Sequence, residues 1–179
     1  MCIRDRSKVF FSPRLATERE AVAKQVQPGE VIVDMFAGIG PFSIIIAKTR
    51  VPKAIYAIDL NPEAIAFMKE NIAINKVRVV TPILGDAREE IAKLEKADRI
   101  IMNLPHDASG YVGDAMRSLK PGGVIHYYEV MEEGQIKSRL DSLRDIAMRE
   151  GRVMKELARR RVKSYSPTLN FYGFDLQFL

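Results

Sequence analysis

The stretch Asp34-Met35-Phe36-Ala37-Gly38-Ile39-Gly40-Pro41 decides how this chain is expected to fold. The apolar run at residues 31–36 that leads into it has the length and composition of a short buried strand. Gly38 ends the run, and Pro41 suits the first position of a helix. The stretch therefore predicts a strand, a tight glycine turn and a helix in direct succession.

The rest of the chain continues this alternation. Further strands are predicted at residues 53–59, 77–84, 99–103 and 124–130, and helices at 41–48, 61–75 and 133–150. Asn61 is expected to cap the helix at 61–75. Two late strands, near residues 153–163 and 170–179, are separated by a short turn and must pair antiparallel. Strands alternating with helices form a parallel sheet. The chain is thus predicted to be α/β, with five parallel strands and a terminal antiparallel hairpin, which resembles the Rossmann-like fold of class I S-adenosylmethionine-dependent methyltransferases.

Composition excludes several other classes of protein. The 179 residues are 47% hydrophobic and 28% charged, as expected for a globular chain with one domain and a sizeable core. The densest apolar run, residues 42–47, is far shorter than the ~20 residues of a membrane helix, so no membrane partner is expected. One cysteine and a charged N-terminus without an apolar segment favour a cytoplasmic protein.

The positive charge is concentrated late in the chain. Residues 137–163 hold ten basic and four acidic side chains, a net charge of +6, whereas the whole chain carries +5. Such a run is most simply a solvated helix face. It becomes a candidate surface for a polyanion only when other observations indicate a nucleic acid.

Three acidic residues, Asp34, Asp59 and Asp86, each end a predicted strand. Gly38 and Gly40 allow a tight turn and close approach of a ligand, although such a pair can also be a plain turn. Asp59 follows Gly40 by 19 residues, and an acid at about this sequence separation commonly binds the ribose hydroxyls of a nucleotide cofactor. The alternative is that Asp59 is simply an acid favoured near the start of a helix. Carboxylates suit ribose hydroxyls, an amine and a cationic sulfonium and would repel a pyrophosphate, so S-adenosylmethionine is favoured over NAD.

A possible chemical site follows the fourth strand, in the sequence Asn103-Leu104-Pro105-His106. An amide followed by a turn stiffened by proline can position a planar ring that bears an N–H group. The alternative is a capping asparagine before an ordinary turn. Upstream of the first strand, Ser12 or Thr17 could cap a helix, and the nearby arginines could be surface charge.

Taken together, the motifs resemble one family, the archaeal and eukaryotic tRNA (guanine-N1)-methyltransferases that modify guanosine at tRNA position 37. The resemblance runs from about Val9 to Leu179. The motifs that carry it are Phe-Ser-Pro-Arg-Leu with Glu-Arg, Asp-Met-Phe-Ala-Gly-Ile-Gly-Pro-Phe-Ser, Tyr-Ala-Ile-Asp-Leu-Asn-Pro, Asn-Leu-Pro, Gly-Gly-Val-Ile-His-Tyr-Tyr and Val-Lys-Ser-Tyr-Ser-Pro.

The resemblance implies a role for each matching residue. Glu18 matches a general base that removes the N1 proton of guanine, Asn103 a residue that contacts both cofactor and base, and Pro105 shapes that corner. The cofactor S-adenosylmethionine is expected at Arg19, Phe36, Gly38, Gly40, Asp59, Leu60, Asn61, Asp86, Ala87 and Asn103. The anticodon loop of tRNA is expected at Arg14, Arg159, Arg160, Arg161 and Lys163. A monomer without a metal is expected, and His106 and His126 could be structural.

The sequence also departs from the family. The family carries an N-terminal RNA-recognition domain and an insert with an arginine that steadies charge on the guanine oxygen; neither is recognised in these 179 residues, which are therefore expected to be a fragment. Residues 1–7 match nothing in the family, so they are expected to be a non-native scar before a catalytic domain at residues 8–179. Two other functions stay open: the related aminocarboxypropyl transfer of the wybutosine pathway, and a catalytically incomplete fragment that binds cofactor or RNA.

Overall fold

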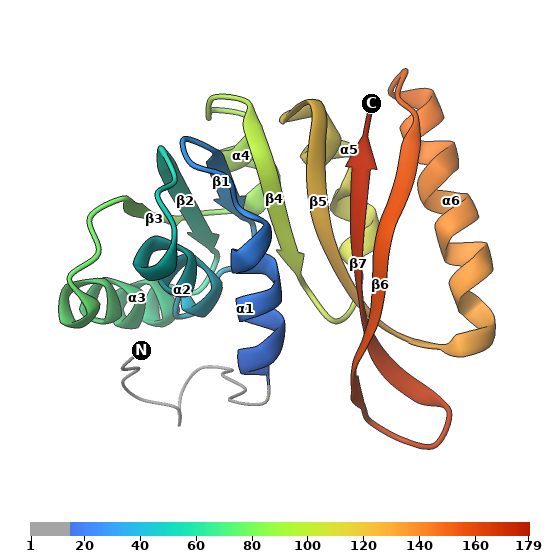
Figure 1. The fold of residues 1–179 in the computed structure, drawn as a ribbon, viewed down its shortest axis with the longest axis horizontal. Coiled ribbons are helices and arrows are strands. Elements are labelled where there is room, and N and C mark those ends of the chain that lie inside the picture. The colour runs from blue at the N-terminus through green and yellow to red at the C-terminus, as the bar shows by residue number, and fades with distance from the viewer. Residues whose placement is uncertain (1–14) are drawn as a thin grey trace. The chain divides into compact units, whose positions relative to one another are not determined.

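The computed structural model describes residues 15–179, and the chain divides into two compact units, Met1–Lys93 and Leu94–Leu179 (Figure 1). The expected boundary after residue 7 lies outside the described residues. No helix within residues 15–179 is long and apolar enough to cross a membrane.

The first unit contains three parallel strands in the order β3-β2-β1. Its elements are α1 (Ala16–Gln25), β1 (Val31–Asp34), α2 (Pro41–Thr49), β2 (Ala54–Asp59), α3 (Pro62–Asn75), β3 (Val80–Leu84) and α4 (Ala87–Ile91). In the register, Asp34 pairs with Ala57, and Asp59 pairs with Leu84. The carboxyl ends of the three strands therefore meet at one edge of this sheet.

Helix starts in the first unit follow local sequence. Pro41 is the first residue of α2, and the Asn61 side chain caps α3 by accepting the Glu63 amide at 2.9 Å. Both predictions are confirmed. The first strand is shorter than predicted and ends at Asp34, because the chain then turns and the Ala37 amide donates to the carbonyl of Ile58 at 2.9 Å.

The second unit contains four strands in the order β4-β5-β7-β6. Its elements are β4 (Ala97–Asn103), η2 (Ala108–Tyr111), α5 (Val112–Arg117), β5 (Leu119–Glu132), η3 (Glu133–Gln135), α6 (Ile136–Arg149), β6 (Met154–Ser164) and β7 (Leu169–Phe178). Strands β4 and β5 are parallel, whereas β7 is antiparallel to both β5 and β6. The predicted α/β class, with mostly parallel strands and an antiparallel C-terminal hairpin, is confirmed.

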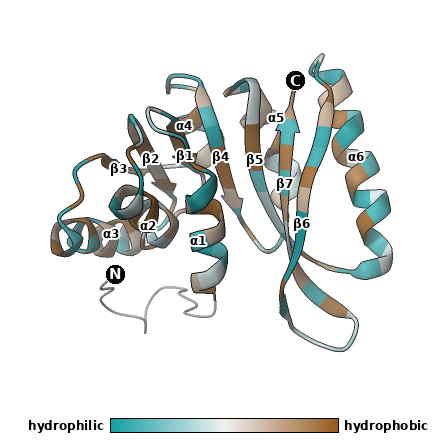
Figure 2. Cartoon of the chain, viewed as in Figure 1, coloured by the Kyte–Doolittle hydropathy of each residue, from teal (hydrophilic) through white to brown (hydrophobic). Residues whose placement is uncertain are grey.

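The core of the second unit is aromatic and aliphatic. Tyr127, Tyr128, Phe174 and Phe178 are fully buried. Apolar and polar residues alternate along α6, and apolar segments run through β5 and β7 (Figure 2). Burial of one stripe of α6 against α5 and β6 explains why a helix of such polar composition is stable here. The residues of that stripe are Ile136, Leu140, Leu143 and Ala147.

A row of polar side chains, buried on three strands and half-buried on the fourth, crosses the four strands of the second unit. The ring of His126 lies between Asp175, whose Oδ1 is 2.7 Å from Nδ1, and Arg99, whose Nη1 is 2.8 Å from Nε2. Arg160 donates two further hydrogen bonds of 2.7 Å to Asp175. A guanidinium group only donates, so Nε2 must accept and Nδ1 must carry the proton. His126 is thus neutral and structural, and burial lowers its pKa below the usual value.

Candidate functional site

The glycine turn after β1 needs backbone conformations that favour glycine. Gly38 has a φ of 55° and Gly40 a φ of 79°, both in the left-handed region. The Gly40 amide donates to the carbonyl of Ala37 at 2.9 Å, and its carbonyl accepts from Ile44 in the first turn of α2. A Cβ atom on Gly40 would lie 2.8 Å from the side chain of Met68. These two positions therefore fix the shape of the turn.

Asp59 connects this turn to the end of β2. Its Oδ2 accepts the Gly38 amide at 2.6 Å, and its Oδ1 accepts the Asn61 amide at 2.9 Å. Each carboxylate oxygen can accept more than one hydrogen bond, so both retain capacity for ligand hydroxyls. Leu60, the next residue, is exposed. The contacts give Asp59 a structural role, and its role in binding a ligand stays a prediction.

Asp34, at the end of β1, has an orphaned buried oxygen. The Ser43 hydroxyl donates to Oδ2 at 2.9 Å, but Oδ1 has no hydrogen-bond partner within residues 15–179. Burial, with a smaller contribution from the negative charge of nearby Asp59, raises the pKa of this carboxyl group to about 7. An unpaired buried carboxylate oxygen is costly, so this atom suits a donor or cation on a ligand.

Asp34 was predicted to lie at a strand end, but no individual ligand contact was predicted for it. The available signal was an acidic residue at the end of an otherwise apolar strand, directly before a glycine turn. What the sequence did not reveal is that Ser43, nine residues later, would satisfy only one of the two oxygens. That difference depends on packing between β1 and α2.

The third acid has a clear local role. Asp86 caps α4, because its Oδ1 accepts the Arg88 amide at 2.8 Å. Ala87 behind it is buried. The neighbouring Gly85 amide donates to the Asp59 carbonyl at 3.1 Å, which joins the ends of β2 and β3. The predicted acids of the first unit therefore end strands at one sheet edge.

Two residues of α1 complete the first unit's candidate site. The side chains of Glu18 and Arg19 are buried, although both belong to the first turns of a polar helix. The guanidinium of Arg19 lies 5.9 Å from the ring centre of Phe42, and its positive charge offsets a small part of the rise in the pKa of Asp34 that burial causes. Arg19 is thus near the glycine turn, whereas Arg14 lies outside the described residues.

The second unit carries the Asn-Leu-Pro corner. Asn103 is the last residue of β4 and pairs in register with Tyr128 of β5. Two residues later, the carbonyl of Pro105 accepts the Val130 amide at 3.0 Å. The corner is therefore held by β5 and does not form a free loop. His106, the next residue, is exposed.

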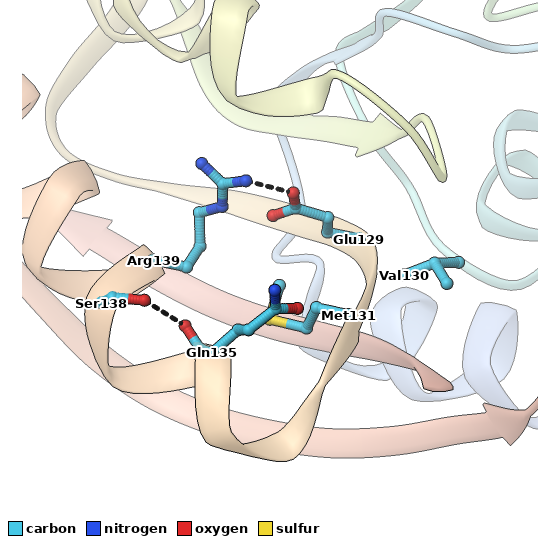
Figure 3. A pocket seen from close by; sticks show the side chains of 6 residues that line it. All are labelled: Glu129, Val130, Met131, Gln135, Ser138 and Arg139. Atoms are coloured by element: carbon cyan, nitrogen blue, oxygen red, sulfur yellow. Dashed lines mark hydrogen bonds and ion pairs between the residues drawn. The ribbon is translucent and has the colours of Figure 1, made fainter. Parts of the chain in front are cut away.

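A polar pocket of about 300 Å³ lies beside this corner, at the end of β5 and the start of α6 (Figure 3). The carboxylate of Glu129 accepts from the Tyr127 hydroxyl at 2.5 Å and from Arg139 at 2.6 Å. Burial raises the pKa of the Tyr127 hydroxyl, which keeps it a donor. The lining residues are Glu129, Val130, Met131, Gln135, Ser138 and Arg139. Arg139, counted in the basic run, thus has an acidic partner that sequence spacing did not indicate.

The four described residues of the predicted RNA surface have different surroundings. Arg159 donates to Glu156 at 2.8 Å and lies 5.7 Å from the ring centre of Phe174, whereas Arg160 is held by the buried Asp175. Arg161 is exposed, and Lys163 Nζ lies 4.3 Å from a ring centre. Their role in RNA binding stays a prediction.

Fold and site together define a class: an α/β domain of the S-adenosylmethionine-dependent methyltransferase type, with a glycine turn and strand-end acids. Residues 2–155 match the model of the TRM5/TYW2 methyltransferase domain. The chain belongs to this family.

Individual relatives agree with this assignment. The chain is 48% identical over 91% of its length to tRNA (guanine(37)-N(1))-methyltransferase Trm5b of Pyrococcus abyssi, and 43% identical over 97% to the Methanocaldococcus jannaschii Trm5b. The chain spans about half the length of each of these two relatives, 48% in both cases. The crystal structure of P. abyssi Trm5b matches with a TM-score of 0.88 at 46% identity, over 96% of this chain and 51% of that one. The crystal structure of M. jannaschii TYW2 in complex with AdoMet matches with a TM-score of 0.87 at 35% identity, over 96% of this chain and 78% of that one.

Proposed function

We propose that this chain is the catalytic part of a methyltransferase that moves a methyl group from S-adenosylmethionine to N1 of guanosine 37 in tRNA. The observation that carries the proposal is the Asn103-Leu104-Pro105 corner, fixed on β5 by the hydrogen bond from Val130 to Pro105. Family membership and the relatives named as guanine-N1 methyltransferases support it.

The residues of the first unit fit S-adenosylmethionine. When bound, this cofactor supplies a methyl group activated by a sulfonium. Gly38 and Gly40 allow the backbone to approach it closely, and the free acceptor capacity of Asp59 suits its ribose hydroxyls. The unpartnered Oδ1 of Asp34 suits its ammonium group. The remaining predicted contacts are Arg19, Phe36, Leu60, Asn61, Asp86 and Ala87.

Catalysis requires a nucleophilic ring nitrogen. N1 of guanine is a poor nucleophile while protonated, so the Glu18 carboxylate is proposed to take that proton as N1 forms its bond to the methyl carbon. The amide of Asn103 orients the base, and Pro105 keeps the corner rigid, which reduces the entropic cost of alignment. Arg19 lies next to Glu18 in sequence and beside Phe42; it is proposed to contact the cofactor.

The proposed substrate is the anticodon loop of tRNA, with the chain acting as a monomer in the cytoplasm. A relative has been solved as the complex of aTrm5 and tRNALeu, matched at 40% identity with a TM-score of 0.80. Exposed basic groups of β6 supply phosphate contacts in this proposal, because such contacts provide much of the affinity for nucleic acids.

The second candidate is aminocarboxypropyl transfer. An aminocarboxypropyltransferase of M. jannaschii is 37% identical over 97% of this chain, a clear but weaker likeness than that of the methyltransferases. The Asn-Leu-Pro corner favours methyl transfer. A third relative, tRNA 4-demethylwyosine(37)-methyltransferase Taw21 of Saccharolobus solfataricus, is 48% identical over 72% of the chain, so a wyosine-type base is a second methyl acceptor to test.

One assay separates these candidates. The chain is incubated with S-adenosylmethionine and tRNA transcripts that carry guanosine or adenosine at position 37, and small-molecule and nucleoside products are identified by mass spectrometry. We expect S-adenosylhomocysteine and N1-methylguanosine from the guanosine transcript alone. Methylthioadenosine would identify aminocarboxypropyl transfer, and cofactor binding with neither product would identify a catalytically incomplete fragment.

A further inference from the structure

A continuous row of aromatic side chains connects the edge of the second unit that carries Asn103 to an exposed residue. Tyr128, the register partner of Asn103, stacks on Phe171 of β7 with ring centres 5.6 Å apart and planes at 27°. Phe171 in turn meets the ring of Tyr165 edge-on, with centres 6.5 Å apart. Tyr128 and Phe171 are buried, whereas Tyr165 is 47% exposed.

The turn that carries Tyr165 is held in place. The amides of Tyr165 and Ser166 both donate to the Leu169 carbonyl, at 2.9 and 3.1 Å, and the Leu169 amide donates to the Ser166 hydroxyl at 3.0 Å. The turn lies at the end of the second unit where β4 also ends (Figure 1). The exposed ring is therefore presented by a fixed turn and supported by buried rings, beyond the end of β4 in the direction in which that strand runs (Figure 1).

A basic side chain lies over this ring. Lys163 Nζ lies 4.3 Å from the ring centre of Tyr165. Residues 157–174 contain four basic side chains and no acidic one. A supported aromatic ring beside a cation matches the two parts of an unpaired nucleotide, because the base has a flat π-face and its phosphate is an anion. An acidic peptide would match the cation but would leave the ring without a specific partner.

We infer that Tyr165 is a stacking platform for an unpaired base of the RNA substrate, and that Lys163 contacts the phosphate of the same strand. The inference rests on the proposed function, since it assigns a further contact to that RNA. Stacking does not read base identity, so Tyr165 holds the single strand beyond the end of β4 and does not select its sequence.

The test measures binding of a fluorescent anticodon stem-loop to the full 179-residue chain by anisotropy. Tyr165→Ala is expected to weaken binding about tenfold, equivalent to about 1.4 kcal/mol, because truncation removes the stacking face. Tyr165→Phe keeps the ring and should bind like the parent. The matched control is Leu157→Ala, because Leu157 belongs to the neighbouring strand β6 and is 45% exposed, close to the 47% of Tyr165.

Two further measurements separate stacking from charge. Lys163→Ala should reduce the slope of log affinity against log salt by about one, while Tyr165→Ala should leave that slope unchanged. A fully paired RNA of equal length should bind the parent and Tyr165→Ala equally, because it offers no unstacked base. Thermal unfolding of each variant confirms that the fold is intact.

The inference is overturned if folded Tyr165→Ala binds the stem-loop as tightly as the parent, or if the parent does not bind it. It is also overturned if Tyr165→Phe is as weak as Tyr165→Ala, since the hydroxyl and not the ring would then matter. A parent that binds the stem-loop, with the expected loss in Tyr165→Ala, but makes no N1-methylguanosine would contradict the proposed function alone.

Discussion

The buried carboxyl group of Asp34 is expected to couple ligand binding to a change in its protonation. Its carboxyl group ionises near neutral pH because it is buried, and its Oδ1 has no partner within residues 15–179. A cationic ligand group at that atom would bind the ionised form and disfavour the neutral one. Ligand binding and proton loss are then linked at this single residue.

We therefore expect the affinity for S-adenosylmethionine to rise as pH increases from about 5.5 to 7.5 and to level off above that range. The affinity is expected to rise with pH because the pKa of Asp34 is raised to about 7, so that its carboxyl group is mostly neutral below this pH and mostly charged above it. Isothermal titration calorimetry across this range measures the effect. Asp34→Asn should bind more weakly and without the pH dependence. Methylthioadenosine, which lacks the ammonium, should show a flat profile, and a flat profile for both ligands would exclude contact with Asp34.

Glu18 is the second residue whose role can be isolated. Glu18→Gln keeps the size of this buried side chain but cannot accept a proton, so turnover is expected to fall by about 10²- to 10⁴-fold. Single-turnover methylation of tRNA measures the rate, and calorimetry measures cofactor affinity, which should stay nearly constant. A large loss of cofactor affinity would contradict the assignment of Glu18 as the base.

At the scale of elements, the polar row through β4, β5, β7 and β6 makes stability depend on pH. His126 is buried and neutral, so its folded pKa is lowered while that of the unfolded chain stays near 6.5. The unfolded state therefore takes up a proton that the folded state does not. The stabilising contribution is complete above about pH 6.5 and is lost progressively as pH falls below it.

The corresponding experiment compares the parent with His126→Gln in urea at pH 8, 7, 6 and 5. Loss of one ring nitrogen leaves either Arg99 or Asp175 with one partner fewer, so the variant should be about 1–3 kcal/mol less stable at pH 8. The difference between the two proteins should shrink toward pH 5. A difference that stays constant with pH would mean that His126 is not held neutral.

The sequence predicted local features correctly where the residues that determine them are close together along the chain. The Asn61 cap and the Pro41 start of α2 depend on neighbours within a few residues, and both were predicted. The partnership of His126 with Asp175 spans 49 residues and depends on the register of β5 against β7. No local pattern encodes that register, so His126 was interpreted only as structural.

The candidate site likewise has features that the sequence predicts and contacts that depend on tertiary packing. The glycine turn and the strand-end acids follow from residue type and position and were predicted, as was the Asn103 corner. The Val130 contact that holds the corner, the ion pair of Glu129 with Arg139, and the buried support beneath Tyr165 depend on which strands become neighbours. Sequence identified the chemical groups, and tertiary packing determines which of them are already engaged.

At the scale of the whole molecule, binding of cofactor should stabilise the chain through mass action. At a free ligand concentration of 100 Kd the gain is about 2.7 kcal/mol, which corresponds to a rise in Tm of roughly 5–10 °C for a chain of this size. Differential scanning fluorimetry with increasing S-adenosylhomocysteine measures it, with NAD as the matched control. An unchanged Tm at saturating ligand, or an equal shift with NAD, would contradict the cofactor assignment.

Among the strands of residues 15–179, β6 pairs only with β7 and thus ends the strand order of its unit. An unpaired strand edge is a template on which another copy of the chain can add, and proteins discourage this with charged side chains and bulges. β6 has both, since its register shifts at Glu156/Ala158 and at Arg161/Lys163 and basic residues follow one another along it. Neutralising those residues to probe RNA binding would therefore also remove a barrier to aggregation, so solubility and nucleic-acid affinity are coupled in this strand.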